Sequence, residues 1–243
     1  MNTDQTKSKM KFLRLHGMLQ RYESIIDCMR TDDLPDFHTG VGMLIEAQYD
    51  DKIQSSIANA LKQSKLRYKI DPQDIECSRQ RGLSKEQWIQ ICEGNFINDG
   101  TNIIILGATG VGKSAIACAL GKQMCRIGKK VLYYNGSKFN EEIKASKLNG
   151  SYMKFLNRVS KVPVLILDDF GLKPLDEFAR TALFDILEDR SGNGSVIIAS
   201  QLPISNWYDR FGDRTLAEAC MDRMTGNAIK IQLTGESRRT RQK

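Results

Sequence analysis

The residues best suited to chemistry form a glycine-rich stretch at positions 107–114, with the sequence GATGVGKS. The stretch fits the pattern G-x-x-x-x-G-K-[ST], follows a short apolar run and precedes a helix-like segment, which is the context of a phosphate-binding loop. Glycines let backbone N–H groups approach an anion closely. We expect Lys113 to place its charge on the β- and γ-phosphates of ATP and the Ser114 hydroxyl to bind Mg²⁺. The predicted nucleotide-binding residues are Gly107, Ala108, Thr109, Gly110, Val111, Gly112, Lys113, Ser114 and Ala115.

A second candidate is the acidic pair Asp168 and Asp169, which follows the apolar residues 164–167. A buried parallel strand delivers its last side chains to the sheet edge where phosphates bind. We therefore expect Asp168 to hold Mg²⁺ and Asp169 to orient the attacking water. The alternative is that Asp169, a shorter acid than the Glu found in many such ATPases, only caps the turn into Gly171.

Three further polar residues are candidates on position alone. Gln201 follows the fourth apolar run and would lie between the two nucleotide motifs, where it could contact the γ-phosphate or the attacking water; a polar strand end is the alternative. Arg223 and Arg239 follow later in the chain. An arginine that reaches a neighbouring subunit's γ-phosphate can raise turnover by ~10³–10⁵, but spacing alone favours solvated surface charges at both positions.

The elements that must position these residues follow from the hydrophobic pattern. Short apolar runs alternate with helical patterns in the second half of the chain, which indicates a parallel sheet covered on both faces. The runs occupy residues 102–106, 131–134, 162–167, 195–199 and 228–233. The sequence therefore predicts an α/β domain over residues 95–235, followed by a basic tail at 236–243.

The first part of the chain, residues 1–94, has a helical pattern and is predicted to form a small all-α domain. An amphipathic helix is expected over residues 10–30 and a second helix over 43–64, with Ile53, Ile57, Ala60 and Leu61 facing inward. Ser84 followed by Gln87 resembles a capping box that opens a short helix ending at Gly94. This domain is a candidate for oligomerisation and for DNA or partner contacts.

Composition narrows the class of protein. The chain has 243 residues, of which 41% are hydrophobic, so a sizeable core is feasible. No run of 18 apolar residues occurs and the N-terminus lacks the apolar stretch of a secretory signal, so we expect a cytosolic protein, in the bacterial cytosol near the nucleoid, without a membrane span. Six cysteines without a C-x-x-C pair, and only two histidines, argue against a zinc site.

Net charge is +7, which permits nucleic-acid binding. The basic residues gather in three runs, at 7–21, 52–70 and 122–161, and several phosphate contacts per subunit are expected from them. Few aromatic residues are interleaved, so base stacking on single strands is not indicated. A solvated face is the alternative for each run. The candidate DNA contacts are Lys7, Lys11, Arg14, Arg21, Lys62, Lys65, Arg67, Lys69, Lys138, Lys144 and Lys147.

Taken together, several segments resemble the IstB family, the AAA+ ATPase helpers of IS21-type transposons, which are related to the DnaC and DnaI helicase loaders. The similarity covers roughly residues 10–240 and is carried by GATGVGKS, VLILDDFG, SQLPISNWYDRFGD, LAEACMDRMTGNA and GESRR. LRLHGM and the LP-x-x-x-W stretch at 202–207 are typical of the transposon branch.

The resemblance implies an AAA+ core with the strand order 5-1-4-3-2. It implies that Gln201 is the first sensor, where Asn is usual, that Arg223 is the arginine finger, and that Arg239 is the second sensor. The chain continues only about ten residues past the fifth apolar run, so no C-terminal helical lid is expected.

The resemblance also implies an ATP-dependent homo-oligomer on duplex DNA that remodels the DNA and recruits and stimulates a partner transposase. Three alternatives remain open at this point. One is a helicase loader that prefers single-stranded DNA and a replicative helicase, and another is a small-molecule P-loop kinase, although no acceptor-binding insertion separates Asp169 from Gln201. The third is a nucleotide-binding scaffold that does not hydrolyse ATP, which Asp169 in place of Glu keeps open.

Overall fold

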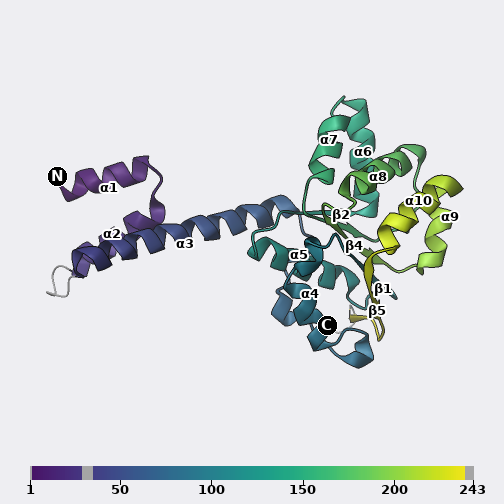
Figure 1. Cartoon of the computed structure of the whole chain (residues 1–243), viewed down its shortest axis with the longest axis horizontal. Coiled ribbons are helices and arrows are strands. Elements are labelled where there is room, and N and C mark those ends of the chain that lie inside the picture. Colours follow the sequence, from purple (N-terminus) through teal and green to yellow (C-terminus); the bar gives the residue numbers. More distant parts are fainter. Residues whose placement is uncertain (1, 29–34, 239–243) are drawn as a thin grey trace. The chain divides into compact units, whose positions relative to one another are not determined.

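The computed structural model describes residues 2–28 and 35–238 of the chain (Figure 1). The chain divides into two compact units, Met1–Asn59 and Ala60–Lys243. Arg239 and the rest of the chain after residue 238 lie outside the described residues. In the part of the chain that is described, no helix is long and apolar enough to cross a lipid bilayer.

The smaller unit contains α1 (Thr3–Phe12), α2 (His16–Cys28) and most of α3 (Phe37–Ser64). The single helix predicted over residues 10–30 is therefore wrong. Arg14 has a φ of 58°, in the left-handed region, and a helix cannot continue through that conformation. The spacing of the apolar residues gave no sign of this break, because the apolar residues on either side of Arg14 keep a helical period.

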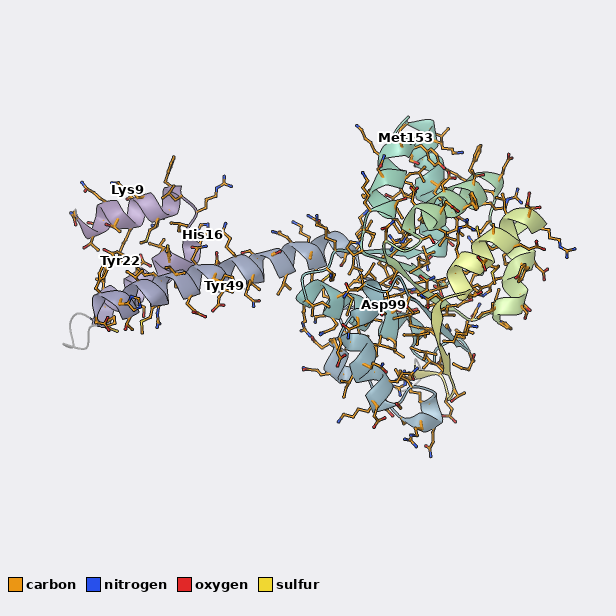
Figure 2. All side chains as sticks on the ribbon, viewed as in Figure 1. Lys9, His16, Tyr22, Tyr49, Asp99 and Met153 are labelled. Carbon is orange, nitrogen blue, oxygen red and sulfur yellow. The ribbon has the colours of Figure 1, made fainter. Side chains whose placement is uncertain are left out.

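α3 begins at Phe37, six residues before the predicted start. Asp36 caps it, because its carboxylate accepts hydrogen bonds from the backbone N–H groups of His38 (3.0 Å) and Thr39 (3.1 Å). α2 packs closely on α3 at Gly17, where a Cβ would lie 2.2 Å from the carbonyl oxygen of Ala47. The exposed face of α3 keeps several apolar side chains, including Tyr49, which is 63% exposed (Figure 2), and Ile53, which was predicted to face inward and is 38% exposed.

The larger unit is built on a parallel sheet of five strands in the order β2-β3-β4-β1-β5. This is the predicted order read from the other edge, so the AAA+ core topology is confirmed. The strands are β1 (Asn102–Gly107), β2 (Val131–Asn135), β3 (Val164–Asp168), β4 (Ser195–Ser200) and β5 (Ala228–Leu233). Each coincides with a predicted apolar run to within two residues, because β-branched runs of this length bury both faces of a strand.

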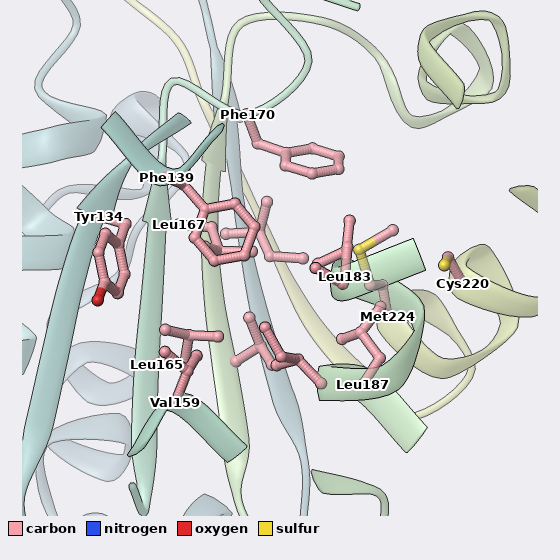
Figure 3. Packing of buried hydrophobic residues seen from close by; sticks show 14 of the residues in the cluster. Tyr134, Phe139, Val159, Leu165, Leu167, Phe170, Leu183, Leu187, Cys220 and Met224 are labelled. Atoms are coloured by element: carbon pink, nitrogen blue, oxygen red, sulfur yellow. The ribbon is translucent and has the colours of Figure 1, made fainter. Parts of the chain in front are cut away.

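Helices cover both faces of this sheet (Figure 1). One face carries α4 (Lys85–Cys92) and α5 (Lys113–Arg126). The other face carries α6 (Gly136–Leu148), α7 (Tyr152–Ser160), α8 (Glu177–Arg190) and α10 (Arg214–Thr225), with the short α9 (Tyr208–Phe211) beside them. In Figure 3, Leu183 and Leu187 of α8 and Met224 of α10 belong to the same buried cluster as the β3 side chains Leu165 and Leu167.

The segment between α3 and β1 belongs to the larger unit, so the boundary between units lies at residue 59 rather than near residue 94. Short 3-10 turns η2 (Pro72–Asp74), η3 (Arg79–Arg81) and η4 (Asn95–Ile97) connect α3, α4 and β1. Leu83, Trp88 and Ile91 are buried in the core beneath β1 and α5. Full burial of one such side chain contributes about 1.5–3 kcal/mol, which fixes the segment to the sheet. The predicted cap is confirmed, since Ser84 accepts a hydrogen bond from Gln87 N–H at 3.1 Å.

Candidate nucleotide-binding site

The glycine-rich loop joins β1 to α5, as the sequence predicted. Gly110 and Gly112 have φ values of 88° and 102°, which only glycine adopts without strain. A Cβ on Gly112 would lie 2.6 Å from a guanidinium nitrogen of Arg81. Lys113 is the first residue of α5 and is buried, and its Nζ donates a hydrogen bond to the Ala108 carbonyl at 2.8 Å. The loop backbone and the start of α5 therefore form an anion-binding concavity.

Asp168, the last residue of β3, is completely buried beside this loop. Its Oδ1 accepts a hydrogen bond from Ser114 Oγ at 2.9 Å, so the two predicted Mg²⁺ ligands touch each other. Its Oδ2 accepts a hydrogen bond from the Tyr133 hydroxyl at 2.6 Å. Burial and the bond to Asp168 raise the pKa of Tyr133, which keeps this hydroxyl a donor. A hydroxyl and a carboxylate oxygen at one point suit Mg²⁺, which prefers oxygen ligands.

Asp169 follows in a left-handed conformation, with a φ of 54°. Its Oδ2 accepts a hydrogen bond from Asn135 Nδ2 at 2.8 Å, and Arg67 Nη1 lies 3.6 Å from the same oxygen. Asp169 lines the cavity at the phosphate loop. Asp169 therefore lies where the prediction placed it, and its role at the attacking water stays a prediction.

Trp207 packs against the turn after β3 that holds Asp168 and Asp169, which we call the acidic turn. Trp207 was not predicted to belong to the site. It is fully buried, and its ring packs edge-on against Phe170, with ring centroids 4.9 Å apart. Its Nε1 donates to Ser200 Oγ at 3.2 Å, and Ser200 Oγ donates to the Phe170 carbonyl at 2.8 Å. The end of β4 and the turn after β3 are thus tied together through one indole ring.

A cavity of about 370 Å³ opens at the phosphate loop, within the range of small-molecule sites. The predicted residues that line it are Thr109, Gly110, Gly112, Lys113, Ser114, Ala115, Asp169 and Gln201. The residues that the sequence did not reveal are Tyr68, Ile70, Asp74, Ile75, Glu76, Arg81 and Arg238. The apolar members come from the segment after α3, which lacks any recognisable motif, so only the fold brings them to the loop.

Two arginines lie against the phosphate loop from segments outside it. Arg81 is 8% exposed and donates to the Val111 carbonyl at 2.9 Å, and burial together with the charge of Arg238 lowers the pKa of its guanidinium. The backbone N–H of Arg238 donates to the Gly110 carbonyl at 3.0 Å. Arg239, the predicted second sensor, lies outside the described residues. The sequence did contain a signal that could have pointed to Arg238, because the GESRR segment ends in two adjacent arginines, Arg238 and Arg239.

Gln201 lies at the cavity, whereas Arg223 does not. Gln201 lines the cavity, and its Oε1 accepts a hydrogen bond from Thr109 Oγ1 of the phosphate loop. Arg223, on α10, is not among the described residues that line the cavity. It forms an ion pair with Glu188 and lies over the Phe184 ring at 5.3 Å. The predicted role of Arg223 as an arginine finger therefore stays a prediction.

The predicted DNA contacts are distributed over both units, and four of them have partners within the chain. Lys7 pairs with Glu23 at 3.3 Å, Lys144 pairs with Asp176 at 2.7 Å, and Arg67 lies beside Asp169. Lys147 lies over the rings of Tyr152 and Phe178 at 4.8 and 4.0 Å. The remaining candidates are exposed: Lys11, Arg14, Arg21, Lys62, Lys65, Lys69 and Lys138.

A parallel sheet in this order, with a phosphate loop after β1 and a buried acid ending β3, defines a P-loop protein of the AAA+ type. A sequence model described as "IstB-like ATP binding protein" matches residues 8–243, and the chain belongs to this family. An insertion sequence ATP-binding protein of Sinorhizobium fredii is 36% identical over 238 residues, which cover 98% of this chain and 97% of that protein. One named for insertion sequence IS1162, from Pseudomonas fluorescens, is 35% identical over 84% of this chain and 89% of its own length.

Solved structures share the fold at low sequence identity. AMPPCP-bound DnaA from Aquifex aeolicus superposes with a TM-score of 0.59 and 21% identity, over 72% of this chain and 53% of that one. The DnaC helicase loader superposes with a TM-score of 0.56 and 20% identity, over 70% of this chain and 99% of that one. These similarities support the AAA+ fold and nothing finer.

Proposed function

We propose that this protein hydrolyses ATP and uses the nucleotide to assemble on duplex DNA, where it recruits and stimulates the transposase of the same insertion sequence. The observation that carries the proposal is the direct bond between Ser114 and the buried Asp168, with Asp169 next to it on the cavity wall. A phosphate loop that only binds nucleotide does not need a second carboxylate at this place.

Each residue of the site has a distinct task in this proposal. The N–H groups of the loop and Lys113 hold the phosphates, and the glycines leave room for them. Bound Mg²⁺ would be held by Ser114 and Asp168 and would offset charge that builds up on the phosphates. Asp169 orients water and accepts its proton, and Gln201 lies close enough to the loop to contact the same water.

Arg223 fits a role across a subunit boundary, since it is on α10 and away from the cavity of its own chain. We expect Arg223→Ala to lower turnover by about 10³-fold. Lys113→Ala removes the loop lysine but leaves Arg223 intact, so a mixture of the two inactive proteins should regain part of the activity. Steady-state phosphate release from mixtures of varied ratio measures this, and mixtures as inactive as their components would contradict action between subunits.

DNA and a transposase are proposed as partners on two grounds. The relatives are named for insertion sequences, and the chain carries ten Lys/Arg against two Glu over residues 122–161. Exposed members of that run, Lys138 on α6 and Lys154 on α7, belong to the helix pair that also carries Met153, which is 65% exposed (Figure 2). Such contacts with phosphates bind DNA with little sequence preference.

The test is binding to a labelled duplex of ~60 base pairs and to a single strand of equal length, with ATP, ADP or no nucleotide, at two salt concentrations. We expect multimeric, ATP-dependent binding to the duplex that weakens by nearly one log unit per log of salt for each phosphate contact. Lys138→Gln should reduce that slope, and Lys113→Ala should remove the dependence on ATP. Preference for the single strand would instead favour a helicase loader, and binding to neither would contradict the proposal.

A further inference from the structure

Two neighbouring carbonyl groups of the phosphate loop are held by donors from outside the loop. The Gly110 carbonyl accepts a hydrogen bond from the Arg238 backbone N–H at 3.0 Å, and the Val111 carbonyl accepts one from Arg81 Nη2 at 2.9 Å. Arg81 ends η3, before β1, whereas Arg238 follows β5. The loop is therefore held by two segments that lie far from it in the sequence.

The bond to the Val111 carbonyl also sets the direction of a loop N–H group. The Val111 carbonyl and the Gly112 N–H belong to one peptide unit, and in a planar trans peptide these two groups point in opposite directions. A donor on the carbonyl therefore keeps the Gly112 N–H turned away from the Arg81 guanidinium. N–H groups that already have a fixed direction bind an anion at a smaller cost in conformational entropy.

Arg81 is itself held in place by the chain around it. Its Nη1 donates a hydrogen bond to the Glu76 carbonyl, so both ends of the guanidinium fork are bound to backbone oxygens. Its backbone N–H donates to Ser78 Oγ at 3.2 Å, and its carbonyl accepts from the Thr234 N–H at 3.0 Å. A planar fork that is bound at both nitrogens cannot turn without breaking both bonds.

The charge of Arg81 indicates that this support serves an anion. Arg81 is buried and lines the cavity at the phosphate loop. Within the described part of the chain it forms no ion pair, and the carboxylate of Glu76 pairs with Arg238 at 2.7 Å. Buried charges in proteins are normally paired. A polyphosphate in the cavity would supply the negative charge that the protein does not place beside this guanidinium.

We propose that Arg81 is a positioning residue of the phosphate loop, which fixes the peptide unit between Val111 and Gly112 for binding of the nucleotide's polyphosphate. This inference rests on the part of the proposed function that places ATP at the loop. It does not depend on hydrolysis or on DNA. It assigns the segment before β1, which carries no recognisable motif, a direct part in phosphate binding.

The expected effect is a loss of affinity rather than of turnover at saturating ATP. Arg81→Met removes both hydrogen bonds, and we expect the Kd for ATP to rise about tenfold to hundredfold, as for loss of a hydrogen bond from a charged donor. The value of kcat should stay within about threefold. Arg81→Lys keeps the charge but cannot bond two carbonyls in a fork, so its Kd should lie between the two. Arg79→Met, at an exposed arginine of the same turn, is the matched control and should leave Kd unaltered.

Competition by inorganic tripolyphosphate shows which part of the nucleotide depends on Arg81. Displacement of a fluorescent ATP analogue is measured at a temperature where thermal unfolding shows each variant to be folded. Arg81→Met should weaken the binding of tripolyphosphate and of ATP by the same factor. Weaker binding of ATP alone would place Arg81 at the base or the ribose and overturn the inference, and so would an unaltered Kd in Arg81→Met. If Arg81→Met does not fold, Arg81→Lys decides, and a Kd equal to that of the unchanged protein then overturns the inference.

The same measurements separate this inference from the proposed hydrolysis. An unchanged protein that binds ATP without releasing phosphate would contradict the proposed hydrolysis, whereas a raised Kd in Arg81→Met would still support the role of Arg81. An unchanged protein that binds neither ATP nor tripolyphosphate would contradict both.

Discussion

The phosphate loop and the acidic turn after β3 lie side by side in the site but are built in different ways. The loop is local, because eight consecutive residues supply its glycines, its lysine and its hydroxyl. The acidic turn depends on distant segments, since Tyr133 and Asn135 from β2, Arg67 from beyond α3, and Trp207 after β4 all hold it. A local site resists distant substitutions, whereas an assembled site should respond to changes in each supporting segment.

The largest effect is expected at the loop itself. Lys113→Ala removes the charge that the buried lysine places in the anion-binding concavity, and ATP hydrolysis should fall by about 10²–10³-fold or more, with nucleotide binding weakened as well. Phosphate release and binding of a fluorescent ATP analogue measure the two effects. Lys85→Ala, at an exposed lysine that also begins a helix, is the control. A Lys113→Ala protein with unaltered turnover would remove the loop from the account.

Removal of the Asp169 carboxylate should lower the rate of hydrolysis but leave the affinity for ATP almost unchanged. Asp169→Asn keeps the shape of the side chain but removes the base, so we expect kcat to fall about 10²-fold while the Kd for ATP stays within about threefold. Asp99→Asn, at an exposed acid before β1 (Figure 2), should leave both unaltered. If hydrolysis survives in Asp169→Asn, Asp169 has no part in the mechanism and the scaffold alternative gains support.

The two tryptophans test whether the acidic turn needs support from a distance. Trp207→Ala and Trp88→Ala each empty a buried site, and each should lower the free energy of unfolding by about 3–5 kcal/mol. Only Trp207 packs on Phe170, so only Trp207→Ala should also lower kcat, by about tenfold, at a temperature where both proteins are folded. Denaturant unfolding and phosphate release compare them. Equal losses of kcat in both variants would argue that general loosening, rather than the turn, is responsible.

The smallest effect is expected at the hydroxyl that bonds to Asp168. Tyr133→Phe deletes one hydrogen bond to a buried carboxylate, which should cost about 1.5–3 kcal/mol of stability and lower kcat severalfold. Tyr134→Phe is the neighbouring control, because the Tyr134 hydroxyl contacts Arg158 and lies away from the site. Its kcat should be that of the unchanged protein. A Tyr133→Phe protein without any change in kcat would show that the turn tolerates loss of this support.

The difference between the local phosphate loop and the acidic turn, which distant segments hold, also explains how much could be predicted from the sequence. All five strands and their order were predicted, because buried parallel strands leave contiguous β-branched runs and the resemblance fixed their order. The phosphate loop, Asp168 and Asp169 were predicted from local spacing. Arg81, Arg67 and Trp207 were not assigned to the site, because each of them reaches it only through tertiary packing. Trp207 is part of the LP-x-x-x-W stretch that carried the resemblance, but that stretch does not show what the indole ring packs against.

In the helical first part of the chain, the spacing of apolar residues predicted helices but not where they end. The period of the apolar residues continued through Arg14, so a single helix was predicted where a left-handed residue separates α1 from α2. The boundary between units was placed at the change of texture near residue 94. The observed boundary at residue 59 depends on side chains such as Leu83 and Trp88 packing beneath β1. Periodicity shows which residues avoid water but not which surface they pack against.

The most direct test of the account is a structure of the protein with Mg²⁺ and a non-hydrolysable ATP analogue. The account predicts the phosphates along residues 107–114, Mg²⁺ bound by Ser114 with Asp168 beside it, and Asp169 turned to the γ-phosphate. A nucleotide bound elsewhere, or a bound triphosphate with Asp168 and Asp169 both directed away from it, would contradict the central claim that the loop and the acidic turn form one site.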